Sequence, residues 1–361
     1  MYDLCIIYVW YITMDNYQPP FKISSEILNL VSQISELLGR ISYLGDLSKM
    51  PALRRLNRLK SVQSSCAIEQ NTLSLDEVTQ IIDGKEIKAG SFKEQAEVIN
   101  AYNAYSIISE INPYSLKDLL KVHGIMVKGL APEAGSLRTR EVGVYKGNIL
   151  IHAAPKHTFV PQLINQLIEW TKTTDIHPLI KSSIFHYEFE FIHPFNDGNG
   201  RTGRYWQTLI LSKWNPIFAW LPIESIIYKH QMEYYKVIEQ CDHIGDCTQF
   251  IVFMLKTIKE TIDNLIIDTK NIPEEIPYNV KQLLKVLQDY YEITPKELMD
   301  KLHIKSRDTL RNSYLKPAME LNLIKMVYPN TPRSKLQRYK TQKNHHSLNI
   351  NSIYIVNTYF I

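Results

Sequence analysis

Apolar residues recur every three or four positions along most of the chain. Near the N-terminus the positions with this spacing are Leu30, Val31, Ile34, Leu37, Leu38 and Ile41. Such spacing places apolar side chains on one face of a helix. It predicts further helices over residues 92–108, 115–127, 161–172, 177–191, 224–240 and 246–267. Ser74 and Glu77 form a capping box, which predicts another helix over residues 74–83. The fold is therefore predicted to be mainly α-helical.

One segment breaks the helical pattern. The apolar residues on either side of Lys146-Gly147-Asn148 are Val142, Val144, Tyr145, Ile149, Leu150 and Ile151. Two short apolar runs joined by a Gly-Asn turn predict a β-hairpin.

The C-terminal part has a different pattern. Prolines and charges mark residues 271–277 as a linker, and helices are predicted over residues 280–290, 295–302 and 306–322. Apolar runs at residues 324–327 and 336–339 follow and predict a strand pair. This order is typical of a winged helix-turn-helix. Pro317 within the third helix predicts a kink or an early end.

Charge is distributed unevenly over the 361 residues, which have a net charge of +4. Residues 273–343 hold 14 Lys and Arg against 8 Asp and Glu, whereas the rest holds 27 against 29. A basic C-terminal module favours an acidic partner such as DNA, and the basic residues of its third helix and wing are Arg307, Arg311, Lys316, Arg333, Lys335 and Arg338. A dimerisation or substrate-docking module is the alternative, and a merely solvated basic surface is another.

The cysteines and the termini bear on location. Cys5, Cys66, Cys241 and Cys247 lack metal-ligand spacing, so we expect structural thiols in a reducing compartment. Residues 2–13 are apolar but lack a basic flank and are too short to cross a bilayer. Because Met14 follows them, an upstream start-codon artefact is an alternative. We expect a cytoplasmic protein without a membrane partner.

The strongest chemical signal is a run of twelve residues, His193-Pro194-Phe195-Asn196-Asp197-Gly198-Asn199-Gly200-Arg201-Thr202-Gly203-Arg204. It lies between two helix-compatible stretches and therefore predicts a loop that feeds a helix N-terminus, where unpaired amides bind anions.

Each residue type in this run suits the handling of phosphate. Arg201 and Arg204 supply charged forks for phosphate oxygens. Asp197 can hold a hard divalent cation, and His193 can accept a proton at neutral pH. The combination predicts phosphoryl or nucleotidyl transfer. A solvated loop is the competing interpretation, but so many roles in so few residues weigh against it.

The run resembles the signature of the Fic-domain family, His-Pro-Phe-x-Asp/Glu-Gly-Asn-Gly-Arg-x-x-Arg, and matches every specified position. The resemblance extends over about residues 20–265. It implies transfer of AMP from ATP to a Ser, Thr or Tyr hydroxyl of a protein, the chain itself included. His193 would be the base and Asp197 the ligand of Mg²⁺ or Mn²⁺. The remaining nucleotide-binding residues of the loop would be Gly198, Asn199, Gly200, Arg201, Thr202, Gly203 and Arg204.

Other parts of the chain also match family positions. The hairpin would be a flap that aligns the target protein by strand addition. Its residues that line the nucleotide would be Ile149, Leu150, Ile151 and His152. Tyr234 and Tyr235 resemble the tyrosine pair at the adenine site, although they equally suit the core of a helix. Asp242, which stands where relatives often have Asn, would be a further nucleotide-binding residue.

Ser65 to Glu69, followed by Gln70, resembles the family's inhibitory motif Ser/Thr-x-x-x-Glu-Gly/Asn. The resemblance implies that Glu69 pairs with Arg204 and so occupies the charge that the γ-phosphate needs. A routine surface glutamate is the alternative. Gln70 departs from the motif, because Gly or Asn tolerates positive φ far better than Gln. We therefore expect Gln70 to strain or reshape this turn.

Together these features predict a Fic-type helical bundle with a β-hairpin flap and a C-terminal winged helix. The expected division is a poorly packed segment (1–19), N-terminal helices with the inhibitory motif (20–110), the catalytic core (111–270), the winged helix domain (271–343) and a tail (344–361). The expected activity is protein adenylylation restrained by Glu69, with removal of AMP as a second activity. Transfer of UMP, phosphate or phosphocholine is an alternative, and so is a DNA-binding regulator with a nucleotide-sensing core. The expected partners are ATP, a target protein at the flap and, for the C-terminal module, DNA or a second copy.

Overall fold

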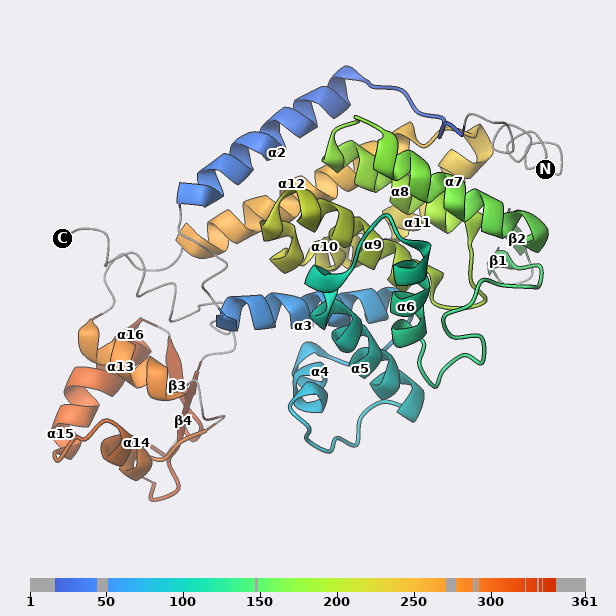
Figure 1. Ribbon diagram of the computed structural model, residues 1–361. Coiled ribbons are helices and arrows are strands. Elements are labelled where there is room, and N and C mark those ends of the chain that lie inside the picture. Colours follow the sequence, from blue (N-terminus) through green and yellow to red (C-terminus); the bar gives the residue numbers. More distant parts are fainter. Residues whose placement is uncertain are drawn as a thin grey trace. The chain divides into compact units, whose positions relative to one another are not determined.

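The computed structural model describes residues 17–43, 51–146, 149–270, 277–287, 290, 292–321, 323–329, 331–332 and 334–341 (Figure 1). The chain divides into two units, residues 1–38 with 57–263 and residues 39–56 with 264–361. Buried apolar side chains form a core in each unit.

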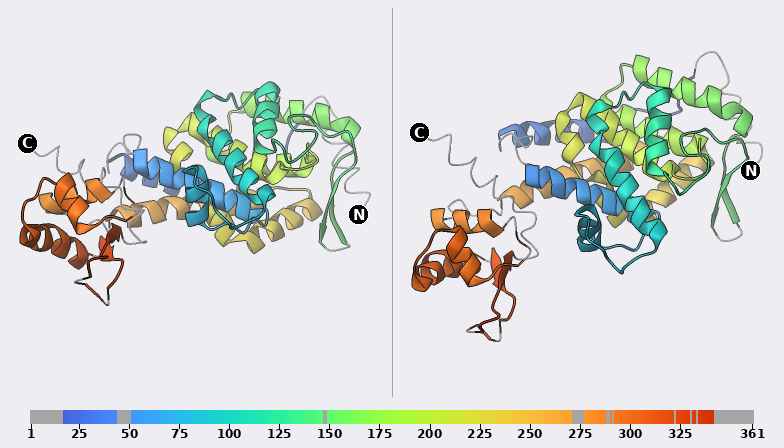
Figure 2. Two further views of the ribbon diagram at one scale, coloured as in Figure 1. Left: turned by 90° about the horizontal axis from the view of Figure 1, so that it is seen from below. Right: turned by 60° about the horizontal axis from the view of Figure 1, so that its bottom comes forward.

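The first unit is a helical bundle with one hairpin. Before the hairpin come α2 (Ser25–Tyr43), α3 (Pro51–Ile68), α4 (Leu75–Ile82), α5 (Phe92–Ser106), η2 (Ile108–Glu110) and α6 (Leu116–Met126). Strands β1 (Gly143–Lys146) and β2 (Ile149–Ala153) pair antiparallel, and their hairpin extends beyond the helices at one end of the unit (Figure 2). Then follow η3 (His157–Phe159), α7 (Val160–Thr173), α8 (Pro178–Ile192), α9 (Asn199–Trp214), η4 (Pro216–Trp220), α10 (Ile223–Lys229), α11 (Gln231–Ile244) and α12 (Thr248–Lys270).

Helices α8 and α9 form the centre of this unit. Phe185, Phe189 and Trp206 are completely buried on them, and almost every other side chain of α8 is buried as well. A helix that is apolar on all sides is stable only when other helices surround it. The loop between α8 and α9 is the His193–Gly198 run, so the central helix pair fixes both ends of the predicted site.

The helical pattern is confirmed along most of this unit. Ser74 caps α4 through a complete capping box with Glu77, as predicted. The prediction of one helix over residues 224–240 is wrong, because His230 lies between the end of α10 and the start of α11. This residue leaves helical geometry (φ −107°, ψ 29°), and its Nε2 lies 3.0 Å from an oxygen of Glu260. The turn residues 147–148 of the predicted hairpin lie outside the described part of the chain.

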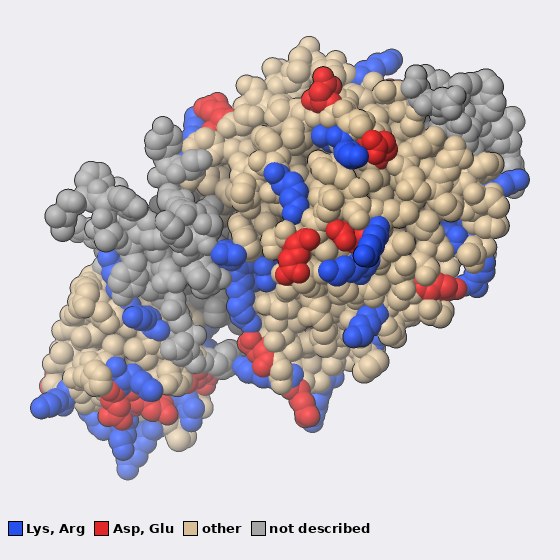
Figure 3. All heavy atoms as spheres, in the orientation of Figure 1, with Lys and Arg blue, Asp and Glu red and all other residues tan. Residues whose placement is uncertain are grey.

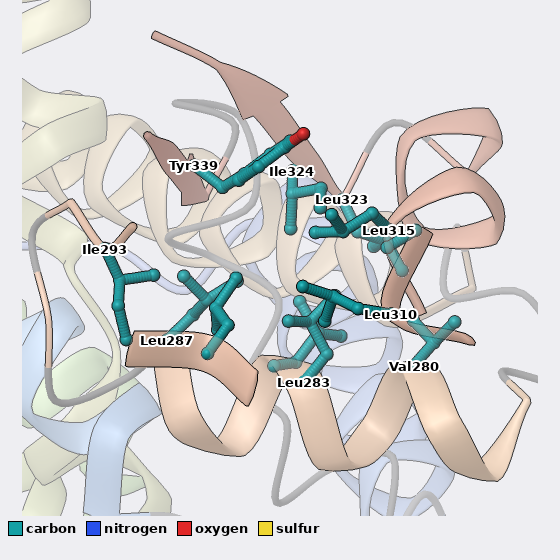
Figure 4. Packing of buried hydrophobic residues seen from close by; sticks show 12 residues of the cluster. Val280, Leu283, Leu287, Ile293, Leu310, Leu315, Leu323, Ile324 and Tyr339 are labelled. Carbon is teal, nitrogen blue, oxygen red and sulfur yellow. The ribbon is translucent and has the colours of Figure 1, made fainter. Parts of the chain in front are cut away.

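The second unit contains α13 (Tyr278–Leu287), α14 (Pro295–Lys301), α15 (Arg307–Thr309), η5 (Leu310–Leu315), α16 (Lys316–Glu320), β3 (Ile324–Met326) and β4 (Tyr339–Thr341). Figure 4 shows its core, in which Leu283 of α13 and Leu310 face Leu323 and Ile324. Strands β3 and β4 pair antiparallel. The second strand begins at Tyr339 rather than at residue 336, because Leu336 is exposed in the preceding loop.

Pro317 does not end its helix, which continues to Glu320. The chain runs through α15, the π-helical turn η5 and α16 without interruption. Proline lacks an N–H and clashes with the carbonyl four residues earlier, so a wider π-turn before it accommodates the ring. The helix therefore ends at Glu320, near the predicted boundary.

Tyr17 is packed, although it lies inside the segment expected to be poorly packed. The Tyr17 side chain is buried, and its hydroxyl donates to Glu188 Oε2 at 2.9 Å. The three described cysteines are free and buried, whereas Cys5 lies outside the described residues. Among the helices that the structure describes, none is long and apolar enough to cross a membrane.

Candidate active site

The loop between α8 and α9 is shaped by two residues with positive φ. His193 ends α8 in the left-handed conformation (φ 49°, ψ 60°), and its N–H donates to the carbonyl of Phe189 at 3.0 Å. Gly198 begins α9 at φ 82°. A Cβ at Gly198 would lie 2.6 Å from Cγ1 of Val127, so this position requires glycine for both conformation and space.

The imidazole of His193 is half-buried at the start of the loop. Its Nδ1 lies 3.3 Å from the carbonyl oxygen of Glu190. When Nδ1 carries the proton and donates to this carbonyl, Nε2 holds the lone pair. This is the tautomer that a general base requires.

Asn199 holds the loop together from the inside. Its side-chain oxygen accepts from the N–H of Phe195 at 2.9 Å, and its side-chain nitrogen donates to the Phe195 carbonyl at 2.8 Å. The first helical hydrogen bond of α9 runs from Thr202 N–H to the Gly198 carbonyl at 3.0 Å. The amides of the three residues before Thr202 therefore have no partner within the helix and form an anion-binding terminus.

Arg201 and Asp197 lie together at this terminus. Arg201 Nη2 donates to Asp197 Oδ1 at 3.1 Å, and Arg201 Nη1 forms a 3.4 Å ion pair with Glu97 of α5. Part of its hydrogen-bonding capacity is nevertheless unused, because among the described residues the buried Nε has no partner and Nη1 has the ion pair with Glu97 but no hydrogen bond. Unsatisfied buried donors of this kind are rare in folded proteins and fit a site for an anionic ligand.

Arg204 is bound by the predicted inhibitory segment. Its Nη2 donates to Glu69 Oε1 at 2.8 Å and to the Ser65 carbonyl at 3.0 Å, and its Nε donates to Ser65 Oγ at 3.2 Å. Burial opposes the charge of Arg204, but the nearby Glu69 carboxylate raises its pKa. A Cβ at Gly200 would lie 2.3 Å from Glu69 Oε1, so the carboxylate lies directly over the helix terminus.

The turn after Glu69 is a Schellman motif. Asn71 N–H donates to the Cys66 carbonyl at 3.1 Å and Gln70 N–H to the Ala67 carbonyl at 3.0 Å. Gln70 occupies the position that usually holds glycine and has φ 68°. Of the two expected outcomes, a strained or a reshaped turn, the structure has the strained one, because Gln70 keeps the turn and adopts a positive φ.

Helix α11 also contacts the end of α3, just before Glu69. The side chains of Gln231 and Tyr235 donate to the Ile68 carbonyl at 2.9 Å and 3.1 Å. Tyr235 is 45% exposed, whereas Tyr234 is 1% exposed, and the Tyr234 hydroxyl lies 3.0 Å from His186 Nε2. The two tyrosines of the predicted pair therefore have different environments.

The remaining predicted residues lie around α11 and the hairpin. Asp242 Oδ1 accepts from the Tyr187 hydroxyl at 2.8 Å. The backbone of residues 149–152 forms most of β2, which lies beside α11, although the side chains of these four residues are outside the described part of the chain.

Three residues of the site escaped sequence reasoning. Glu97 contacts Arg201, while His123 and Arg138 bind the main chain of the loop. His123 lies one turn from Leu119 on the buried face of α6, which is the pattern of an ordinary core residue. Arg138 stands in an irregular segment without periodicity, so the sequence carried no signal for its burial.

Fold and loop together define a mainly helical protein in which a histidine lies beside a helix N-terminus with free amides and two arginines. Residues 113–211 match the Fic/DOC family, and residues 278–341 match the C-terminal domain of Fic-like proteins, named for filamentation induced by cAMP. A crystal structure of a Fic family protein from Desulfovibrio desulfuricans is 42% identical, with a TM-score of 0.70 over 91% of this chain and 99% of that one. The chain belongs to the Fic family.

Two further relatives come from animals. The protein adenylyltransferase fic-1 of Caenorhabditis elegans is 31% identical over 62% of this chain and 47% of its own length. The protein adenylyltransferase Fic of Nematostella vectensis is 27% identical over 70% of this chain and 58% of its own length. The chain thus spans about half the length of the curated relatives it matches.

The strain at Gln70 generates a stability prediction. A left-handed conformation costs a residue with a Cβ about 1–2 kcal/mol, and glycine removes this cost. Glycine also gives the unfolded chain more conformational freedom, which offsets part of the gain in stability. We expect Gln70→Gly to raise the free energy of unfolding by about 0.5–1 kcal/mol, measured by urea denaturation. Gln70→Ala is the control, because alanine keeps the Cβ. Equal stability of both variants would contradict the strain.

Proposed function

We propose that the protein is a protein adenylyltransferase that moves AMP from ATP to a Ser, Thr or Tyr hydroxyl of a protein, itself included. The observation that carries the proposal is the loop in which His193 adjoins a helix terminus with Asp197 and Arg201. Relatives named as protein adenylyltransferases support it.

In this reaction the target hydroxyl oxygen attacks the α-phosphorus of ATP. His193 Nε2 accepts the hydroxyl proton as the new oxygen–phosphorus bond forms. The bond from the α-phosphorus to the bridging oxygen breaks, and pyrophosphate leaves. The amides at the start of α9 and the open donors of Arg201 stabilise the negative charge on the phosphates. Arg204 holds the γ-phosphate in the productive pose.

Asp197 is the residue that would hold Mg²⁺ or Mn²⁺. Its side chain is 46% exposed, and Oδ1 already accepts from Arg201 and from the Gly198 N–H. Among the described residues no group of three or more His, Cys, Asp or Glu side chains could hold a metal alone. One carboxylate combined with substrate phosphates is the usual way in which proteins bind Mg²⁺, so the residues fit. The cation would neutralise charge on the α- and β-phosphates.

Two different parts of the protein suit binding of the nucleoside and of the target protein. Exposed Tyr235 suits stacking on a base, whereas buried Tyr234 supports α11 from within. The edge of the β1–β2 hairpin suits pairing with an extended segment of the target, because main-chain bonds do not depend on its sequence. Neither surface determines the nucleobase, so UMP, phosphate or phosphocholine transfer is tested by supplying those donors.

Glu69 restrains this activity. Arg204 is completely buried and needs an anion beside it, and both Glu69 and the γ-phosphate can fill that role. While Glu69 is present, ATP is held in an unreactive pose. Because Gln70 strains the turn by about 1–2 kcal/mol, the restraint is weaker than it would be with glycine. With AMP already attached to a target, Glu69 is placed to position a water for its hydrolytic removal.

Three buried free thiols suit a reducing compartment, so we place the protein in the cytoplasm.

Replacing the base tests the transferase directly. We expect His193→Ala to abolish label transfer from α-³²P-ATP to protein, by at least about a hundredfold, while ATP still binds. Autoradiography and calorimetry measure the two quantities. Undiminished transfer would remove His193 from the mechanism, and γ-³²P-ATP in parallel reactions separates AMP transfer from phosphate transfer.

Releasing Arg204 tests the restraint. We expect Glu69→Gly to raise auto-modification by about tenfold or more, because the buried guanidinium then pairs with the γ-phosphate. Gln70→Gly is the matched control, since it places glycine in the same turn, keeps the carboxylate and is expected to lower the activity. An unchanged rate in Glu69→Gly would show that Glu69 does not inhibit.

A second function, DNA binding by the C-terminal unit, is favoured by its surface. Arg307 and Arg311 are exposed on the helix that begins at α15, and Lys335 and Arg338 are exposed before β4. Figure 3 shows basic side chains on both sides of an acidic group on this unit. Arg333 of the predicted wing lies outside the described residues, and a dimerisation or substrate-docking role for this unit is the alternative.

A gel shift with random duplex DNA at several salt concentrations separates these functions. If the unit binds DNA, the affinity falls steeply with salt, and Arg307→Ala with Arg311→Ala weakens binding about tenfold or more. Lys22→Ala, an exposed lysine of the first unit, is the control. No salt-dependent shift would leave dimerisation or docking as the role of this unit.

A further inference from the structure

We propose that Arg138 and His123 are positioning residues that set the two halves of the catalytic loop separately. Arg138 sets the half that carries His193, and His123 sets the half that carries Asp197. The inference rests on the proposed function, because it assigns these residues to the base and to the phosphate–metal parts of the same reaction.

Arg138 binds the main chain at the end of α8. Its Nε donates to the His193 carbonyl at 2.8 Å, its Nη2 to the Ile192 carbonyl at 3.4 Å, and its backbone N–H to the Pro194 carbonyl at 2.9 Å. Three consecutive carbonyls thus point at one residue, which is 2% exposed. The C-terminal carbonyls of a helix carry partial negative charge, so a buried cation satisfies them all.

We call these three contacts of Arg138 with the carbonyls of residues 192–194 the clamp. The clamp compensates for an unfavourable backbone conformation at His193. His193 has φ 49°, a conformation that side chains with a Cβ rarely adopt, and it persists only when surrounding contacts enforce it. Arg138 supplies such contacts on the carbonyl side of His193. The planar fork donates in several directions at once, which a lysine ammonium on a flexible stem does not reproduce.

The same guanidinium reaches the flap. Arg138 Nη2 also donates to the carbonyl of Pro155, two residues after the end of β2, and Nη1 donates to the Arg140 carbonyl at 2.9 Å. Arg138 therefore connects the strand proposed to hold the target with the residue proposed to take its proton. Movement of the clamp would alter the distance between hydroxyl and base without touching the nucleotide.

His123 binds the other half of the loop. Its Nδ1 accepts from the Gly135 N–H at 3.1 Å, so Nε2 carries the proton and donates to the Asp197 carbonyl at 3.0 Å. Its ring stacks on Phe195 with a centroid distance of 3.6 Å and an interplanar angle of 2°. Together the two contacts use one ring nitrogen as an acceptor and the other as a donor, as in a neutral imidazole.

Asp197 and Gly198 thereby receive their position from α6. Asp197 is the proposed metal ligand, and Gly198 begins the helix whose amides face the phosphates. Residues that orient a metal ligand by hydrogen bonding affect metal affinity, and replacing them typically lowers it by about ten- to hundredfold. We therefore expect His123 to affect the binding of metal and nucleotide. The rate at saturating nucleotide depends instead on the alignment of base and hydroxyl, for which Arg138 is responsible.

The Arg138 test uses the full chain carrying Glu69→Gly, so that Arg204 is free for ATP. We expect Arg138→Lys to lower the rate of AMP transfer at saturating ATP by about ten- to hundredfold, with the Kd for MgATP changed less than twofold. Arg140→Lys is the control, since its side chain is 69% exposed in a surface pair with Glu133. If Arg138→Lys is unstable by thermal denaturation, Arg138→Gln replaces it as a neutral donor.

The His123 test uses the same background. We expect His123→Leu to weaken MgATP binding by about tenfold or more in calorimetry, and His123→Gln to restore most of it, because its amide reproduces the donor to Asp197. Equal losses of affinity and rate in both Arg138→Lys and His123→Leu would overturn the division of roles. So would a failure of His123→Gln to rescue binding while it folds normally.

A separate measurement distinguishes failure of this inference from failure of the proposed function. If the Glu69→Gly parent transfers no AMP, the proposed function fails. The imidazole NMR signal of His193, assigned with His193→Ala, still tests the clamp. A shift of that signal in Arg138→Lys but not in His123→Leu supports the inference, and unchanged signals in both variants overturn it.

Discussion

The structure depends on how one buried cation is neutralised. Arg204 is 2% exposed in the centre of the helical bundle, and a guanidinium there is stable only beside an anion. The carboxylate of Glu69 fills this role at 2.8 Å, and Ser65 accepts two further hydrogen bonds, from Nε and Nη2. The γ-phosphate of a nucleotide would have to take over the same charge. In the proposed function, activity and inhibition are therefore two ways of satisfying one electrostatic requirement.

Two arginines of the site are paired with carboxylates of very different exposure. Glu97 pairs with Arg201 from the middle of α5, and its side chain is 7% exposed. Glu69 stands at the end of α3 with a side chain 35% exposed. Asn71 connects the two, because its side chain donates to Glu97 Oε2 at 3.0 Å. In the proposed function, the γ-phosphate displaces the carboxylate at the helix end, whereas the more buried Glu97 stays paired with Arg201.

The sequence was sufficient wherever local chemistry determines structure. The spacing of apolar residues located the helices, and the capping box at Ser74 located the start of α4 to the residue. Gln70 was expected to be strained because the turn after a helix needs positive φ, and it has φ 68°. Contacts distant in sequence could not be inferred in this way. Arg138 and His193 are 55 positions apart, and no periodicity relates them.

Errors in the helical pattern arose where tertiary contacts overrule local preference. Pro317 should break a helix, yet a π-turn absorbs it because Leu310 and Leu315 remain in the core on either side. His230 reads as part of one long helix, but its contact with Glu260 of α12 accompanies a break in the backbone. In both places a side chain that must reach the core or a partner decides the backbone geometry.

The end of α3 connects Glu69 with the residue proposed to bind the base of the nucleotide. The Ile68 carbonyl immediately before Glu69 accepts from Gln231 and Tyr235 of α11, so the position of Glu69 depends on that helix as well as on its own turn. Tyr235 is also the exposed aromatic ring proposed to meet the base. The residue proposed to stack on the base is thus hydrogen-bonded to the residue just before the carboxylate that pairs with Arg204. The strain at Gln70 would favour release of the turn that holds this carboxylate. The proposed restraint would consequently depend on a few weak interactions around one strong ion pair.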